Sequence, residues 1–297
     1  MKMFRKILMP FVPLYFVATW VRNFCFNQKL FESKSFNFPI ICVGNLNVGG
    51  TGKTPMIEYL IRLLETKHKI TTLSRGYGRQ TKGFIIADNN ATSQIIGDEP
   101  FQFYQKFSNI TVVVGEDRRL AIESLIKLNK EPKLLLLDDA FQHRQVYSGL
   151  NILLTSYDDL YVDDMLLPVG NLRESKSGSD RADIVVVTKC PHDITQQKCF
   201  QIKQRLSIKS YQKLFFSYIG YSQFIYSQQQ EMSLKTLMNK KFTLVTGIAN
   251  PKPLVNYLTE EGLIFKHLVF RDHYDFKQLD ILNFQKEEII VTTEKDY

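Results

Sequence analysis

The sequence predicts an α/β fold built on a doubly wound, mainly parallel sheet, followed by a second, smaller α/β domain. Through the first two thirds of the 297 residues, short apolar runs alternate with amphipathic helical stretches. The runs are continuously apolar, which is typical of parallel strands covered by helices on both faces. After a polar stretch rich in aromatic residues, a second pattern of strand and helix begins near residue 242.

The predicted elements follow one another in a regular order. The strands of the first sheet are predicted at 38–43, 70–73, 110–114, 134–137, 152–154 and 184–187. Helical patterns such as those at 56–65 and 120–128 lie between them. The stretch 206–231 is interpreted as strands or a linker. Strands of the second domain are predicted at 242–247, 268–270 and 289–292.

These elements divide the chain into three parts. Residues 1–28 form an apolar and basic membrane-associating segment, 29–205 form the first domain, and 206–297 form a linker with the smaller domain. A chain of this length, with 44% hydrophobic residues, can bury a substantial core in one large domain or two moderate ones. The four cysteines form no CxxC pair, so we expect reduced thiols in a protein facing the cytosol.

The charge balance favours an anionic partner. The formal net charge is +8 and the sequence pI is about 9.1, which suits a nucleotide, a nucleic acid or an acidic membrane surface. The sequence contains no recognition helix, RNA-binding signature or dense Lys/Arg tract. We therefore expect no nucleic-acid partner.

The amino terminus combines cations with an apolar run. Lys or Arg occurs three times in the first six positions, the stretch 7–21 is almost wholly apolar, and Arg22 follows it. The run is shorter than the roughly 20 residues that span a bilayer as a helix, and Pro10 and Pro13 are expected to interrupt it. We favour an interfacial or partly inserted membrane anchor with Trp20 and the flanking cations at headgroup level. A buried first helix is the main alternative, since no small-x-small cleavage site for a signal peptide follows.

A glycine-rich turn, VGNLNVGGTGKTP, joins the first predicted strand to a helix expected from Pro55. Strand, glycine-rich turn and helix are the context of a P-loop, in which backbone N–H groups and a helix amino terminus bind phosphate. Lys53 is predicted as a catalytic residue that reaches the β- and γ-phosphates, and Thr54 as a ligand of Mg2+. The predicted ATP-binding residues are Asn47, Val48, Gly49, Gly50, Thr51, Gly52, Lys53 and Thr54.

Asn47 stands where the strict pattern GxxxxGK[ST] has glycine. Asn tolerates the left-handed backbone conformation better than other non-glycine residues, so the turn remains feasible. The fold class is therefore expected to be P-loop NTPase-like.

Two further segments bear on the nucleotide. Asp138 and Asp139 follow four leucines, and a buried strand that delivers carboxylates to its carboxyl end is where a P-loop enzyme holds Mg2+. The segment 187–191 is similar to the guanine-reading loop of GTPases, but Pro191 replaces its Asp. ATP is therefore favoured over GTP.

The ordered clusters of polar residues resemble one family, tetraacyldisaccharide 4'-kinase, the lipid A 4'-kinase of Gram-negative bacteria. The matching pieces are VGNLNVGGTGKTP, LSRGYGR, GDEP, DDAFQHR, GNLRES, RADIVVVTK, TGIANP, FRDHYDF and TEKD, in the family's order. Taken singly, clusters such as GDEP also fit an ordinary turn or a solvated edge. The amino terminus is similar to that family's membrane-associating segment.

The resemblance implies a function and a location. It implies ATP- and Mg2+-dependent phosphorylation of the 4'-hydroxyl of tetraacyldisaccharide 1-phosphate to give lipid IVA, a late step in lipid A biosynthesis. It also implies an anionic lipid substrate and association with the cytoplasmic face of the inner membrane. No obligate protein partner is inferred. The alternatives are a P-loop ATPase that acts as a switch or chaperone on a protein, and a kinase for a soluble small molecule.

The resemblance implies roles for single residues as well. Asp98 of GDEP corresponds to the general base that accepts the proton of the sugar hydroxyl, and His273 would orient it. Asp138 and Asp139 correspond to the carboxylates on the magnesium side, and Glu174 of GNLRES would help to place the metal or the phosphates. Further predicted substrate or phosphate contacts are Arg75, Tyr77, Arg118, Gln142 and Arg173.

The chain departs from the family in two places. Ala140 stands where the family often has glycine, a small-for-small change that we expect to be tolerated. The sequence stops at Tyr297, just after TEKD, where relatives usually continue. Either the chain is truncated or the second domain lacks its last elements.

Overall fold

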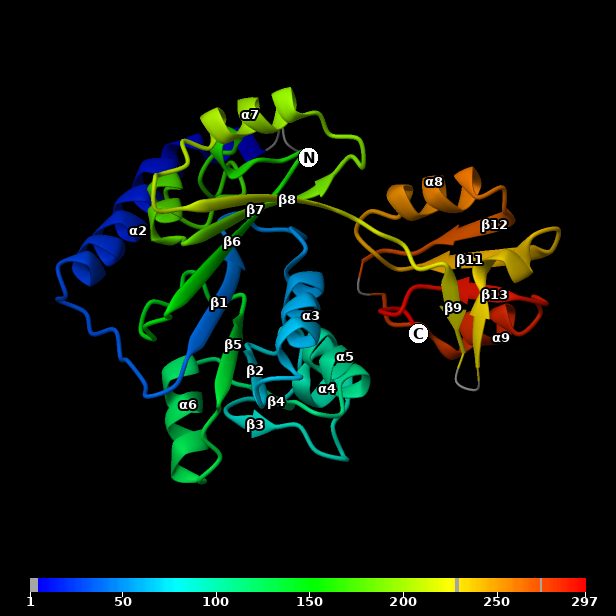
Figure 1. The fold of residues 1–297 in the computed structure, drawn as a ribbon, viewed down its shortest axis with the longest axis horizontal. Helices are drawn as coiled ribbons and strands as arrows, with labels where there is room; N and C mark the ends of the chain where they lie inside the picture. Colours follow the sequence, from blue (N-terminus) through cyan, green and yellow to red (C-terminus); the bar gives the residue numbers. More distant parts are fainter. Residues whose placement is uncertain (1–4, 228–229, 273) are drawn as a thin grey trace. The chain divides into compact units, whose positions relative to one another are not determined.

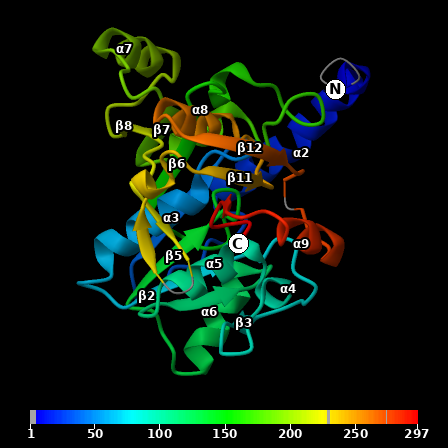
Figure 2. The ribbon, with the colours of Figure 1, turned by 90° about the vertical axis from the view of Figure 1, so that its right-hand side faces the viewer.

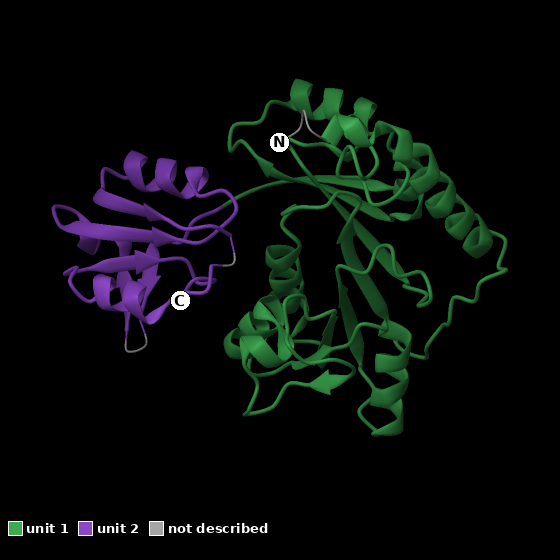
Figure 3. Ribbon diagram, turned by 180° about the vertical axis from the view of Figure 1, so that it is seen from behind, with its two compact units in different colours: residues 1–219 green, residues 220–297 purple. Residues whose placement is uncertain are grey.

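The computed structural model describes residues 5–227, 230–272 and 274–297, and it divides into two compact units (Figure 1). The first unit is Met1–Ile219 and the second is Gly220–Tyr297 (Figure 3). The sequence predicts the division after residue 205. The structure places it later because a further strand, β8, joins the first sheet.

The first unit is built on an eight-stranded sheet, counted over the described residues, with the order β3-β4-β2-β5-β1-β6-β7-β8. Its strands are β1 (Ile40–Asn45), β2 (Ile70–Ser74), β3 (Ile85–Ile86), β4 (Thr111–Val114), β5 (Leu134–Asp138), β6 (Leu150–Ser156), β7 (Ile184–Cys190) and β8 (Lys213–Tyr218). The pairing is parallel throughout, except that the short β3 runs antiparallel to β4. All six predicted strands are present.

Helices cover both faces of this sheet, as continuous apolar strands require. The helices are α2 (Val12–Asn27), α3 (Lys53–Leu64), α4 (Ser93–Ile96), α5 (Asp98–Lys106), α6 (Arg118–Lys127) and α7 (Gln196–Arg205). The 3-10 helices are η1 (Lys6–Phe11), η2 (Tyr161–Asp163) and η3 (Lys176–Arg181).

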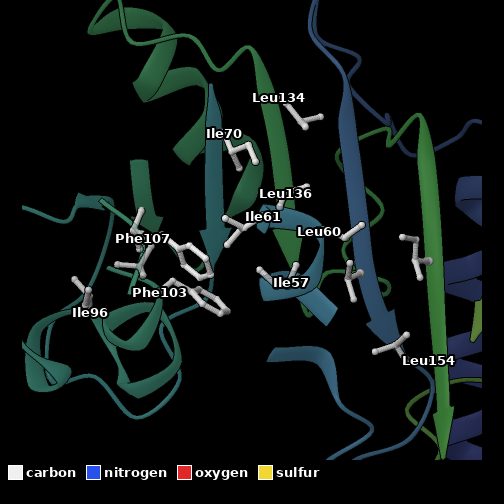
Figure 4. Packing of buried hydrophobic residues seen from close by; sticks show 14 of the residues in the cluster. Ile57, Leu60, Ile61, Ile70, Ile96, Phe103, Phe107, Leu134, Leu136 and Leu154 are labelled. Carbon is white, nitrogen blue, oxygen red and sulfur yellow. The ribbon is translucent and has the colours of Figure 1, made fainter. Parts of the chain in front are cut away.

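The core lies in layers between the sheet and these helices. On one side Ile57 and Ile61 of α3 and Phe103 of α5 pack with Ile70 and Leu136 of the sheet (Figure 4). On the other side Leu135 and Leu137 of β5 pack with Ile122 and Leu125 of α6. The doubly wound arrangement that the sequence predicts is therefore confirmed.

The second unit holds a smaller α/β fold. Its parallel sheet has the order β12-β11-β13, and α8 lies alongside β12 and β11 (Figure 2). Its elements are the hairpin β9 (Phe224–Tyr226) and β10 (Glu231–Ser233), η4 (Leu234–Leu237), β11 (Lys241–Thr246), α8 (Lys252–Glu260), β12 (Ile264–Val269), α9 (Gln278–Phe284) and β13 (Ile290–Thr292). Leu244 and Leu258 belong to its own hydrophobic core.

The amino terminus forms one continuous helical segment, Lys6–Asn27, made of η1 and α2. By length and composition it is the one helix of the described residues that could cross a membrane, and its apolar window is not buried against the protein. The expected interruption by proline is wrong. Pro10 lies inside the 3-10 helix η1, which passes into α2 at Val12. Pro13 lies in the first turn of α2, where the missing proline N–H has no helical acceptor to lose.

Candidate active site

The glycine-rich turn joins the end of β1 to the start of α3. Gly52, with a φ of 87°, is the N-cap of α3, a left-handed position that L side chains rarely adopt. The helix begins at Lys53, two residues before the predicted start, so Lys53 and Thr54 lie in its first turn. Free backbone N–H groups and the helix dipole favour an anion at this position. A glycine-rich turn at the amino terminus of a helix is therefore suited to phosphate.

Asn47 is accommodated for a different reason than the sequence suggests. It is not among the residues with a positive φ, so the turn does not need the left-handed conformation that Asn tolerates. Instead, Asn47 pairs with Leu172 in an isolated antiparallel bridge, and its Nδ2 donates to Asp164 Oδ2 at 3.0 Å. The buried Asn47 side chain thus fastens the start of the turn to the loop before Arg173.

Strand β7 supports the second half of the turn. Thr188 Oγ1 donates to the carbonyl oxygen of Thr51 at 2.8 Å, and Lys189 Nζ donates to the carbonyl oxygen of Gly50 at 2.5 Å. These residues occupy the segment that is similar to a guanine-reading loop, but here they bind the backbone of the P-loop.

Lys53 Nζ contacts side-chain oxygens that phosphate oxygens can replace as its partners. Its Nζ is 3.7 Å from Asp139 Oδ1 and donates to Asn45 Oδ1 at 3.4 Å. Asp139 has a left-handed φ of 46° and also accepts from Arg173 Nη1 at 2.8 Å. Burial opposes ionisation of Asp139, but the charges of Lys53 and Arg173 prevail and lower its pKa. Lys53 and Arg173 therefore lie on either side of the Asp139 carboxylate, next to the P-loop.

Asp138 is the last residue of β5 and is 2% exposed. Its Oδ2 accepts from Ser74 Oγ at 3.2 Å, whereas its Oδ1 is buried with no hydrogen-bond partner. Burial, followed by the negative charges of Glu99 and Asp139, raises the pKa of Asp138 to about 7. A buried carboxylate oxygen without a partner is costly unless a cation or a proton satisfies it.

The SRGYGR and GDEP clusters meet beside this carboxylate. A Cβ atom at Gly97 would lie 2.9 Å from the carbonyl oxygen of Tyr77, so the contact requires glycine. Asp98 follows as the exposed first residue of α5, and Glu99 Oε1 accepts from Thr54 Oγ1 at 2.8 Å. The fold therefore ties the predicted general base to the helix that follows the P-loop.

Glu174 is almost completely buried, with 1% of its surface exposed. Its Oε1 accepts from Arg181 Nη2 at 2.7 Å and from Gln142 Nε2 at 3.0 Å, and its Oε2 accepts from Asn23 Nδ2 at 2.8 Å. Gln142 Nε2 also donates to the carbonyl oxygen of Asn45 at 2.9 Å. These contacts link Glu174 to the end of β1.

The remaining predicted contacts differ in exposure. Arg75 and Tyr77 are exposed. Arg118 is buried, and its guanidinium donates to backbone carbonyl oxygens of Gly115 and Asp138, both at 3.2 Å. In this state Arg118 therefore supports the end of β5. His273 lies outside the described residues.

The predicted metal ligands can be tested for fit. Within residues 5–227, 230–272 and 274–297, no three His, Cys, Asp or Glu side chains form a group that could hold a metal ion. Mg2+ does not need such a cage, because it usually keeps waters and binds one or two carboxylates together with substrate phosphates. The unpaired Oδ1 of Asp138 is the oxygen that fits such a cation.

Comparison with known proteins identifies the family. Residues 4–297 match the family described as Tetraacyldisaccharide-1-P 4'-kinase. The chain belongs to this family. Members of the tetraacyldisaccharide 4'-kinase family from Flavobacterium johnsoniae and Bacteroides thetaiotaomicron are 50% and 44% identical to it. The first alignment covers 100% of this chain and 88% of the relative, and the second covers 98% and 82%. The resemblance drawn from the ordered motifs is confirmed.

A solved structure of the family supports the fold. The crystal structure of "apo" form LpxK from Aquifex aeolicus in complex with ATP is similar with a TM-score of 0.80 and 31% identity. The match covers 99% of this chain and 89% of that one. The P-loop NTPase-like fold class and the prediction of an ATP-dependent kinase are both confirmed.

Several residues at the site were not assigned a role from the sequence. Arg181 and Glu99 lie inside the quoted RADIVVVTK and GDEP motifs, and Asn45 lies inside the P-loop motif, so the motifs could have directed attention to them. Asn23 is different, because it lies in the apolar amino-terminal segment and no local pattern distinguishes it.

Proposed function

We propose that the chain transfers the γ-phosphoryl group of ATP to the 4'-hydroxyl of tetraacyldisaccharide 1-phosphate, giving lipid IVA in lipid A biosynthesis. One observation carries this proposal: in a chain of this family, the P-loop, the paired aspartates at the end of β5 and the GDEP helix converge at one end of the sheet. The ATP complex of the similar LpxK supports the choice of nucleotide.

The P-loop backbone from Asn47 to Thr54 holds the phosphates in this proposal. Lys53 leaves Asp139 and turns to the β- and γ-phosphates, where its charge offsets that of the transferred group. Arg173, beside the same carboxylate, is placed to stabilise the transferring phosphoryl group. Arg75 and Tyr77 are exposed and are assigned to the sugar or phosphate side of the acceptor.

Thr54, Asp138 and Asp139 are the groups that would hold Mg2+, and Glu174 would help to place them. When bound, the ion neutralises charge on the β- and γ-phosphates. Asp138 is the best direct ligand, because its buried Oδ1 lacks a partner. Both oxygens of Glu174 already accept hydrogen bonds, so Glu174 acts by holding Gln142 and Arg181 in place.

Asp98 is assigned as the general base. It takes the proton of the 4'-hydroxyl while that oxygen forms its bond to the γ-phosphorus and the bond to the β-phosphate oxygen of ADP breaks. Asp98 is an exposed residue in the first turn of α5. His273 is assigned to orient it.

The outer side of the amino-terminal helix suits a membrane surface. Leu14, Val17 and Trp20 are among its exposed apolar residues, and the chain is basic overall. We assign the chain to the cytoplasmic face of the inner membrane, because ATP is available there. Neither a nucleic acid nor an obligate protein partner is part of the proposal.

The test is phosphoryl transfer by the full-length chain in detergent micelles. ATP radiolabelled on its γ-phosphate is incubated with Mg2+ and tetraacyldisaccharide 1-phosphate, with Lys53→Ala as the inactive control. We expect label in the lipid in proportion to the ADP formed. Brisk ATP hydrolysis without labelled lipid would instead favour a switch or chaperone ATPase. Label found only in a water-soluble acceptor would favour a soluble small-molecule kinase.

A further inference from the structure

The amino-terminal helix α2 has two chemically different sides. The less exposed positions recur at helical spacing and include Tyr15, Thr19, Asn23 and the buried Phe26. The exposed large apolar residues of α2 are Leu14, Phe16, Val17, Trp20, Val21 and Phe24. One side thus faces the protein with polar groups, while the other presents a hydrophobic surface.

Asn23 joins the inner side of α2 to a buried carboxylate of the site. Its Nδ2 donates to Glu174 Oε2 at 2.8 Å, whereas Gln142 and Arg181 donate to the other oxygen. Arg144 Nη1 donates to the backbone oxygen of Asn23 at 3.0 Å and to its Oδ1 at 3.4 Å, which fixes the direction of the amide. Because Glu174 is 1% exposed, water has little access to replace the amide.

Two further contacts hold the same loops. Tyr15 Oη donates to the carbonyl oxygen of Arg173 at 2.8 Å, and Arg22 Nη2 donates to that of Gln142 at 2.5 Å. In addition, the guanidinium of Arg5 donates to the carbonyl oxygens of residues 168 and 170. Arg5 and Arg22, two of the cations around the apolar run that are expected at headgroup level, are therefore engaged within the protein.

These contacts form a short path to the P-loop. Tyr15 holds the backbone of Arg173, Arg173 binds Asp139, and Asp139 lies 3.7 Å from Lys53. An anchor that served only to attach the chain to a membrane would need apolar residues and cations, but no amide directed at a buried carboxylate. The inner side of α2 is therefore built for the site.

We propose that Asn23 and Tyr15 are positioning residues, through which α2 holds Glu174 and Arg173 in place for phosphoryl transfer. The segment that we assign to the membrane surface is then also a structural part of the kinase site. This inference rests on the proposed function for its main readout, the turnover of the lipid. Its second readout, the binding of Mg·ATP, does not depend on the identity of the acceptor.

The first experiment compares Asn23→Ala and Tyr15→Phe with wild type in full-length protein in detergent. We expect Asn23→Ala to lower kcat by about 10- to 100-fold, the scale of a lost hydrogen bond to a buried charge. Tyr15→Phe removes one oxygen atom and should lower kcat by about 3- to 10-fold. The KM for the lipid and sedimentation with anionic vesicles should stay within about twofold, because the outer side of α2 is unchanged.

Thr19→Ala is the matched control. Thr19 lies on the same side of α2, but its hydroxyl donates to the carbonyl oxygens of Tyr15 and Phe16 in its own helix. Its kcat should stay within about twofold of wild type. If Thr19→Ala and Asn23→Ala lower kcat equally, the positioning role is wrong and α2 matters only as a helix.

A double-mutant cycle separates positioning from lipid contact. If Asn23 acts through Glu174, then Asn23→Ala should have little further effect on kcat in a Glu174→Ala background. Independent, multiplying effects of the two changes would overturn the proposal.

The same cycle is measured with the affinity for a fluorescent ATP analogue and Mg2+. If wild type leaves the lipid unlabelled, the proposed function fails, while this binding cycle still decides the coupling. If Asn23→Ala does not fold, the cycle is measured with Tyr15→Phe and Arg173→Ala in place of Asn23→Ala and Glu174→Ala.

Discussion

Thr54 Oγ1 donates a hydrogen bond to Glu99 Oε1 at 2.8 Å and so connects the first turns of α3 and α5. The two helices carry different halves of the proposed reaction, because α3 follows the P-loop and α5 begins with Asp98. A second connection reinforces the first: the buried Glu58 of α3 accepts from Gln102 of α5 at 2.9 Å. The distance between the phosphate cradle and the proposed base is thus set by helix–helix contacts.

Glu99→Ala should therefore disturb the geometry of transfer more than the binding of nucleotide. We expect kcat to fall by about tenfold or more, since small displacements of a catalytic group are costly, while the KM for ATP changes by about twofold or less. Steady-state kinetics with both substrates measure this. Glu131→Ala, which removes an exposed carboxylate in the loop before β5, is the control and should match wild type. An unchanged kcat in Glu99→Ala would show that the connection is dispensable.

Asp98→Asn tests the assignment of the base with almost no change of shape. An amide cannot accept the proton of the hydroxyl, so we expect kcat to fall by about 10²-fold or more. Binding of a fluorescent ATP analogue should remain close to that of wild type, because Asp98 is not part of the phosphate cradle. Near-normal lipid phosphorylation by this variant would remove Asp98 from the role without affecting the interpretation of the P-loop.

Asp138→Asn should increase stability and abolish transfer. The pKa of Asp138 is raised to about 7 from 3.8. As the pH rises, Asp138 therefore ionises in the unfolded chain before it ionises in the folded protein. Stability from this group is fully present below pH 3.8 and is lost as the pH rises through 7. Removing the charge should therefore raise the Tm in metal-free buffer at pH 8 by roughly 5–10 °C, the equivalent of about 2–4 kcal/mol. Differential scanning calorimetry measures this, and a lower Tm for the variant would contradict it.

His143 gives a pH dependence of the opposite sign. Burial, reinforced by the nearby charge of Arg118, lowers the pKa of His143 to about 4 from 6.5. The unfolded chain therefore binds the proton first as the pH falls, and stability from neutral His143 is lost between pH 6.5 and 4. His143→Gln should reduce the fall in Tm between pH 7 and pH 4.5. An equally steep fall in the variant would assign the acid sensitivity to other groups.

The sequence predicts the central fold well because its signals are local. The strands at the middle of the sheet are continuous apolar runs that end in recognisable polar residues, as β5 ends in Asp138. Prediction is weaker at the edges, where exposed and partly buried residues alternate in β8 and in β12. For that reason the sequence predicts strands or a linker over the stretch that holds β8, and it predicts only the end of β12 as a strand.

The site is predictable where its residues are neighbours in sequence and unpredictable where the fold brings them together. The P-loop is one continuous motif, so its role follows from the pattern. Asn23 and Glu174 are 151 positions apart, and an asparagine in an apolar helix gives no hint of its partner. Likewise, the unpaired Oδ1 of Asp138 follows from packing, which the motif DDAFQHR does not describe.

The outer side of α2 allows membrane binding to be tested apart from the site. Deleting the amino terminus would also remove Tyr15 and its contact with the loop at Arg173, so a loss of activity could not be assigned. Val17→Glu combined with Trp20→Glu changes only exposed positions. Each apolar side chain contributes about 1.5–3 kcal/mol when buried, so the double variant should bind vesicles at least about tenfold more weakly.

The measurement is sedimentation with vesicles that contain phosphatidylglycerol. Leu120→Glu, which changes an exposed leucine on α6, is the matched control and should sediment like wild type. In detergent micelles the measurement does not depend on binding to a bilayer. There the double variant should keep the ATP affinity of wild type, because the inner side of α2 is intact. Unchanged sedimentation of the double variant would reject α2 as the membrane-binding element. A loss of ATP affinity in micelles would show that the two sides of the helix are not independent.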